Sequence, residues 1–355
     1  MRRMTLLTAL VLTAAPAAAQ RPQADPRIVV REQTVVRDSR AVREIARAYQ
    51  GRNNRSEQTE RFSRKIKIGR DGRVTVDNIS GNMTVTTGGG DELSIEAVKR
   101  TRGPQSELAN VRIIVDERAG RVDIRTEHER NYRDRDRDGD HVSVDYTLVV
   151  PSGVAIGLHS ISGNLGVTGA RGSVRAETVS GDVTMTDVPK VELAKSISGN
   201  VTLTGVSTEG DLAAGSVSGN VIAKSLKAHG LDVNSISGNV NVTDVTCERV
   251  AVKTVNGSVE YTGTISKGGT YDFNIHSGSV RLTLENPAGF VLNANSFSGS
   301  IRSDLPLTIG GDSSASGSRN GRTSFGNRRM RATYGDGSAT VTVRTFSGDI
   351  IIAKR

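Results

Sequence analysis

The sequence predicts an all-β fold, a single-chain β-solenoid of the β-helix kind with coils of about 19 residues. A six-residue motif of the form Ser-x-Ser-Gly-Asn-apolar recurs through the middle of the chain, and its glycines are 18, 18, 20, 19, 19, 21 and 21 residues apart. The chain of 355 residues holds 39 glycines but only 3% aromatic residues. This near-constant period and glycine-rich composition indicate stacked coils with tight corners.

Each coil is expected to contain two strands. After each motif glycine, apolar and polar residues alternate, as in Val201-Thr202-Leu203, which is the pattern of a strand with one buried face. A second strand leads into the glycine, with apolar residues seven and five positions before it. The copy before Gly199 has Val191 and Leu193 one place early, which predicts a β-bulge. Two strands fill the coil and leave no room for a helix.

Glycine suits the predicted corner because it reaches positive φ without a Cβ clash. In stacked coils, equivalent residues are about 4.8 Å apart. The Asn or Asp that follows each glycine should therefore form a polar ladder. The predicted structural corner glycines are Gly163, Gly181, Gly199, Gly219, Gly238, Gly257, Gly278, Gly299 and Gly348.

An apolar residue stands two positions before several of these glycines, as at Ile161, Val179, Ile197 and Val217. These side chains either turn inward at the corner or form an exposed apolar stripe. We favour the inward orientation, because a long exposed stripe would promote association.

The N-terminal region reads as an export signal. Residues 1–19 combine Arg2 and Arg3 with a short apolar run and a small-residue cleavage site, which predicts a secretory signal peptide. Residues 20–60 are expected to be a flexible basic leader, with a short helix possible over 41–50. No later apolar run is long enough for a transmembrane helix in the mature chain. We therefore expect an exported protein of the periplasm, the outer-membrane surface or the extracellular space.

Three further regions are predicted. Residues 61–150 should form an N-terminal β capping region, because an uncapped solenoid would expose unpaired backbone groups. Residues 151–303 hold the regular repeats. Residues 304–355 are expected to be a loop insertion followed by a C-terminal β coil, with a last motif copy at 345–350.

The net charge of +9 is unevenly placed. The regular repeats are nearly neutral and both ends are basic, which does not resemble a nucleic-acid groove. The expected partners are acidic envelope polymers, lipid head groups or other envelope proteins, and the oligomeric state is left open. One candidate anion-binding loop interrupts the array, since guanidinium groups on a flexible backbone suit phosphate or carboxylate; a solvated basic loop is the alternative reading. Its arginines are Arg319, Arg322, Arg328, Arg329 and Arg331.

No catalytic, cofactor or metal site is expected. Aspartates between 134 and 145 partly match a calcium loop, but arginines alternate with them, so a self-neutralised hairpin loop is favoured. The five histidines share no metal-ligand spacing, and Cys247, the one cysteine, has the neighbours of a small buried residue.

The chain resembles the bacterial "putative adhesin" β-solenoid family, also called the toast-rack family. The resemblance rests on residues 76–82, 98–100, 146–153 and 337–354 together with the internal Ser-x-Ser-Gly-Asn array, and it covers about 60–355. It implies a secreted or envelope-associated repeat domain and supplies no catalytic residues.

The predicted function is that of a non-catalytic exported envelope protein, an adhesin or a scaffold. One alternative is a sensory or regulatory envelope ectodomain that binds partner proteins. Another is a polysaccharide-active β-helix enzyme, which would need carboxylates clustered on adjacent coils, whereas the motif aspartates Asp182 and Asp349 lie far apart in the sequence.

Overall fold

The computed structural model describes residues 56–129, 142–310, 318–319, 322–325 and 329–355. Within residues 55–355, which form one compact unit, the protein is an all-β solenoid. The predicted signal peptide, the leader up to residue 55, the candidate helix and most of the candidate calcium loop lie outside the described residues.

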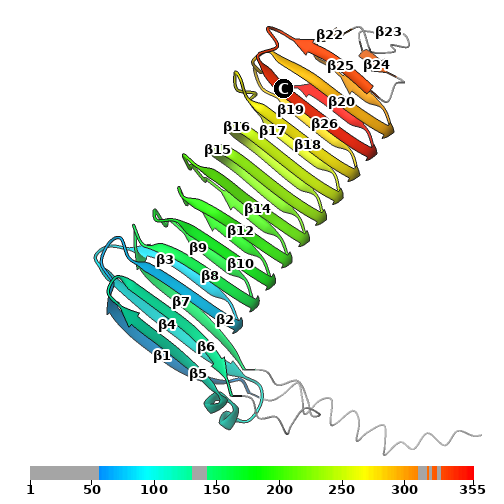
Figure 1. Ribbon diagram of the computed structural model, residues 1–355. Helices are drawn as coiled ribbons and strands as arrows, with labels where there is room; N and C mark the ends of the chain where they lie inside the picture. The colour runs from blue at the N-terminus through cyan, green and yellow to red at the C-terminus, as the bar shows by residue number, and fades with distance from the viewer. Residues whose placement is uncertain (1–55, 130–141, 311–317, 320–321, 326–328) are drawn as a thin grey trace, which may run out of the picture. The chain divides into compact units, whose positions relative to one another are not determined.

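Two sheets of parallel strands face each other across the solenoid core, and each coil contributes one strand to each sheet (Figure 1). The 17-residue strands β15 (Val221–Ser237) and β16 (Val240–Asn256) run through both sheets. The first sheet contains the segments before the motif glycines: β2 (Arg73–Ser80), β8 (Ala155–Ser162), β10 (Val174–Ser180), β12 (Val191–Ser198), β14 (Asp211–Ser218), β18 (Thr270–Ser277), β20 (Phe290–Ser298) and β26 (Ala339–Ser347). The second contains the segments after them: β3 (Met83–Gly88), β9 (Leu165–Thr168), β11 (Val183–Thr186), β13 (Val201–Thr204), β17 (Val259–Gly263), β19 (Val280–Leu284), β21 (Ile301–Ser303) and β27 (Ile350–Lys354).

The expected bulge is confirmed, because the pairing of β10 with β12 shifts register after Val174, which lies opposite Val191. The polar ladder is also confirmed. The side-chain oxygen of Asn220 accepts a hydrogen bond of 2.9 Å from the backbone N–H of Asn239, one coil further on, and Asn200 does the same for Asn220. Each corner is thereby tied to the next by a bond that adds to the backbone ladder.

The corner glycines are required by close backbone approach as well as by backbone conformation. Gly238 has φ +155°, and a Cβ atom placed on it would lie 2.0 Å from the carbonyl oxygen of Gly219 in the preceding coil. Such a distance is far below any van der Waals contact. The stack therefore has no space for a side chain at this position, whatever its conformation.

Our expectation for the residues two positions before the glycine was wrong. The inward position nearest the corner is three residues before the glycine, and a Ser or Thr fills it in most coils, with Asn78 and Ile275 as the exceptions. Ser216 is buried there and donates a hydrogen bond of 2.8 Å to the carbonyl of Gly199 in the preceding coil. Strand alternation then points the next residue outward, so Ile161, Val179 and Ile197 are exposed.

The N-terminal end of the array is covered by antiparallel strands. The second sheet continues from β3 through β7 (Ser143–Pro151) and β4 (Glu92–Thr101) to β1 (Gln58–Lys67). The first continues from β2 through β6 (Arg121–His128) to β5 (Val111–Arg118), and a 3-10 helix, η1 (Gln105–Asn110), lies between β4 and β5 in sequence. The outer strand β1 carries mostly exposed polar and charged residues, which suits an edge that must not pair with another chain.

At the other end, the order of coils in space departs from their order in sequence. Strand β26 pairs in parallel with β18 on one side and with β20 on the other. Its continuation β27 lies likewise between β19 and β21. Figure 1 shows these red C-terminal strands between the yellow and orange coils. The last coil of the sequence is thus inserted one place before the end of the stack.

Antiparallel strands also cover this end. Strand β25 (Arg329–Tyr334) pairs with β20 and with β22 (Thr308–Ile309), and β24 (Arg322–Phe325) pairs with β21 and with β23 (Ser318–Arg319). Part of the segment that we expected to be a loop insertion is therefore a second cap.

Cys247 is buried, as expected, and burial raises the pKa of its thiol to about 11. We expect the folded protein at pH 8 to react with a thiol reagent at least 100-fold more slowly than the unfolded protein, because the thiol is both protonated and inaccessible. With an aromatic disulfide as the reagent, the absorbance of the aromatic thiolate that it releases on reaction with Cys247 measures the rate. Equal rates with and without denaturant would contradict the buried position.

Candidate binding surface

The outward residues two positions before the corner glycines form one continuous row, which we call the corner stripe. It crosses ten neighbouring strands of the first sheet, so it extends over about 43 Å at 4.8 Å per strand. The exposed fractions of its large apolar members range from 36 to 54%, except that Val217 is half-buried. In spatial order the corner stripe consists of Ile79, Ile161, Val179, Ile197, Val217, Ile236, Val255, His276, Phe346 and Phe297.

The corner stripe becomes aromatic at its C-terminal end. The ring of Phe346 stacks on Phe297 with centroids 4.7 Å apart and on His276 with centroids 5.1 Å apart, and the planes are within 9° of parallel. Insertion of β26 between β18 and β20 creates this stack, since it brings Phe346 between the other two rings. The ring faces cover one another, so the stack presents chiefly ring edges to solvent.

A second outward row runs beside the corner stripe, four residues before each glycine. Its N-terminal part carries Asp77, His159 and Glu177. From Lys195 onward it carries three cations and no carboxylate, and Arg329 of the antiparallel strand β25 extends it beyond Asn295 as a fourth cation; we call this part the basic row. It consists of Lys195, Gly215, Asn234, Lys253, Asn274, Arg344, Asn295 and Arg329.

The surroundings leave the basic row largely uncompensated, although Glu177 of β10 is the register neighbour of Lys195. Within the described residues, Lys195, Lys253 and Arg344 form no ion pair. The carboxylates of Asp232 and Asp272 belong to the next row from the corner and are half-buried. The corner stripe is therefore bordered on one side by exposed positive charge.

A shallow groove of about 470 Å³ lies where the corner stripe meets the basic row. Gly215 lacks a side chain between Lys195 and Asn234, which leaves the sheet surface open at that point. Val217 and Ile236 line the apolar side of the groove. A ligand seated here would meet aliphatic side chains and lysine ammonium groups together.

The structure separates the arginines of the predicted anion-binding loop. Arg329 and Arg331 lie on β25 and not on a loop, and both are exposed. Arg319 and Arg322 lie on β23 and β24, and Arg328 is outside the described residues. Asn295 pairs with Arg329 on one side and Arg344 on the other, and a cavity of about 510 Å³ lies over these residues. Arg344, which was not among the predicted loop arginines, thus joins this cluster.

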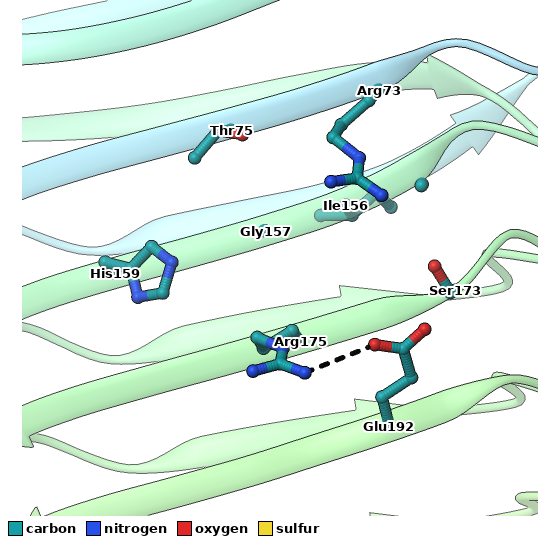
Figure 2. A pocket seen from close by; sticks show the side chains of 9 residues that line it. Arg73, Thr75, Ile156, Gly157, His159, Ser173, Arg175 and Glu192 are labelled. Atoms are coloured by element: carbon teal, nitrogen blue, oxygen red, sulfur yellow. Dashed lines mark hydrogen bonds and ion pairs between the residues drawn. The ribbon is translucent and has the colours of Figure 1, made fainter.

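A smaller pocket of about 280 Å³ lies on the same face of the first sheet, near the N-terminal end of the array. Figure 2 shows Arg73 from β2 and Arg175 from β10 on either side of Gly157 of β8, with His159 nearby. Arg175 forms an ion pair of 3.5 Å with Glu192, so one of the two guanidinium groups is partly neutralised. The pocket suits a small anion, and it has no pair of carboxylates for acid–base chemistry.

Among the described residues, no three His, Cys, Asp or Glu side chains are grouped as a metal site would require. Asp145 of the candidate calcium loop lies on β7, where its carboxylate accepts the backbone N–H of Asn82 and forms an ion pair of 2.9 Å with Arg100. That carboxylate has structural partners. No helix in the part of the chain that the structure describes is long and apolar enough to cross a membrane.

Two packed sheets, laddered corners and capped ends define the protein as a β-solenoid repeat protein that presents long outward rows of side chains. The chain belongs to the Toastrack DUF4097 family, whose model matches residues 105–353. A comparison with curated proteins gives no match.

Several solved bacterial structures are similar at low identity. One, described as a "putative adhesin" from Parabacteroides distasonis, is 14% identical, with 82% of this chain and 97% of that chain covered and a TM-score of 0.39. Another "putative adhesin", from Bacteroides fragilis, is 12% identical, with 83% and 97% covered and a TM-score of 0.38. At these values the likenesses carry no inference about a ligand.

Proposed function

We propose that the protein is a non-catalytic, exported envelope protein that attaches to an anionic component of the cell envelope. The observation that carries this proposal is the exposed corner stripe beside the basic row. A monomer rarely exposes a contiguous apolar row without an interaction partner, and the adjoining cations select for a partner of negative charge.

Attachment requires no chemistry at the site. The two sheets hold the rows at fixed spacing, so ligand contacts can add along the array without rearrangement of the backbone. A rigid, repeated surface of this kind suits an extended partner, because several weak contacts then act together. This design fits an adhesin or a scaffold.

We expect the double variant Lys253→Glu and Arg344→Glu to lose sedimentation with envelope fragments at low salt. Both cations belong to the basic row and are exposed, so charge reversal should repel an anionic partner with little effect on the melting temperature. Binding by the parent protein should also weaken steeply between about 50 and 150 mM salt, as the screening length falls towards 8 Å.

The matched control is the double variant Lys224→Glu and Arg281→Glu. It makes the same charge change at exposed positions on the outward face of the second sheet, and it should sediment like the parent. Equal sedimentation of both double variants and the parent would refute attachment through the basic row.

A further inference from the structure

We propose that the anionic component is a phospholipid bilayer surface, and that the corner stripe inserts into its interfacial region while the basic row lies at the level of the lipid phosphates. This inference rests on the proposed function and names its ligand. The interfacial region of the bilayer would surround the exposed apolar side chains, and the lipid phosphates would neutralise the flanking cations.

The shape of the surface fits a bilayer. Figure 1 shows the strands of the array stacked along a nearly straight line, and the corner stripe has one member on each successive strand of the first sheet, so its side chains can enter a planar interface together. Interfacial binding strengthens with buried apolar area and with attraction to anionic lipids. The aromatic end of the corner stripe coincides with the most basic end of the adjoining row, at Arg344 and Arg329, so both contributions are largest at the same place.

A second copy of this chain fits the same surface less well. In a full-length antiparallel overlap, the middle of the corner stripe lies between Val217 and Ile236. Lys195 of one copy would then lie opposite Lys253 of the other, twice in each dimer. Like charges facing each other in this way destabilise an interface.

A glycan partner is also disfavoured at the aromatic end. Sugar rings pack against the faces of aromatic side chains, whereas the faces of Phe346 are covered by Phe297 and His276. Ring edges and the aliphatic residues Ile197 and Ile236 suit acyl chains and glycerol groups better.

The test uses vesicles of phosphatidylglycerol and phosphatidylcholine, with phosphatidylcholine alone for comparison. The chain contains no tryptophan, so Ile236→Trp introduces a single reporter on the corner stripe. We expect a blue shift of its emission and quenching by brominated lipid with anionic vesicles only. The control reporter Thr184→Trp, exposed on the second sheet, should show neither effect.

Binding of the protein to anionic vesicles should depend on both the corner stripe and the basic row. The double variant Ile197→Ser and Ile236→Ser should bind anionic vesicles at least tenfold more weakly, whereas Val149→Ser, at an exposed apolar residue off the corner stripe, should bind like the parent. The double variant Lys253→Gln and Arg344→Gln should weaken binding about 25-fold, since each cation near an anionic surface contributes roughly fivefold.

The outcomes separate this inference from the proposed function. If envelope fragments bind but anionic vesicles do not, the lipid inference is wrong and attachment to an acidic polymer or an envelope protein stands. If vesicles bind but the Ile236→Trp emission stays unchanged, insertion is refuted. If neither fragments nor vesicles bind, both proposals fail. A parent dimer that the double serine variant dissociates, without vesicle binding, would assign the corner stripe to a second copy.

Discussion

Replacement of Gly238 by alanine should lower the free energy of unfolding by about 3 kcal/mol. The new Cβ atom would lie 2.0 Å from the carbonyl oxygen of Gly219, so the two coils must separate locally. Separation weakens the backbone hydrogen bonds on both sides of the corner, including the one that Gly219 donates to Ser237. The midpoint of urea unfolding, followed by circular dichroism, measures the loss.

Gly268 provides the matched control because it also has positive φ, at +75°, but has no atom within 4 Å of a Cβ position. Gly268→Ala should cost only about 1 kcal/mol, the conformational penalty alone. If the two alanine variants unfold at the same urea concentration, close backbone approach is not what requires glycine at the corners.

Substitution of Val343 by aspartate should destabilise the C-terminal end of the array and lower the free energy of its local opening by at least about 3 kcal/mol. Val343 is fully buried on β26, and the new carboxylate would lie among apolar side chains. Because β26 pairs with β18 and with β20, we expect faster amide hydrogen exchange in all three strands. Strands β8 to β12 should keep the exchange rates of the parent.

Thr340→Asp is the control for this change, since Thr340 is exposed on the same strand. It should leave hydrogen exchange unchanged throughout the array. Faster exchange in β26 alone, with β18 and β20 unaffected by Val343→Asp, would contradict the inserted position of the C-terminal coil and would fit a coil at the end of the stack.

The repeat made the architecture predictable from the sequence. A fixed period, alternation on both sides of a glycine and a polar residue after it are local signals, and each has a single physical reading in stacked coils. The polar ladder and the bulge at Val191 followed from the same register. The order of the last coils did not follow, because every copy of the motif is chemically alike and nothing local says which neighbour it pairs with.

The candidate site was largely missed, for a related reason. We assigned the apolar residue near the corner to the core because a long exposed apolar stripe would promote association. The core position is filled instead by a hydroxyl residue such as Ser216, whose hydrogen bond to the preceding coil makes its burial favourable. Counting by twos from Leu231 and Val233 to Ser235 would have placed Ile236 outside. The contribution of Arg344 could not have been found, since its position depends on the inserted coil.

The inserted coil also sets an order of events in time. A chain is made from its N-terminus, so β20 and β21 exist before β26 and β27, which must lie between them and the coil of β18 and β19. An early contact between β18 and β20 would have to be broken again. The array can therefore reach its final form only after β26 and β27 have been made, so the C-terminal coils cannot be completed in the order of synthesis.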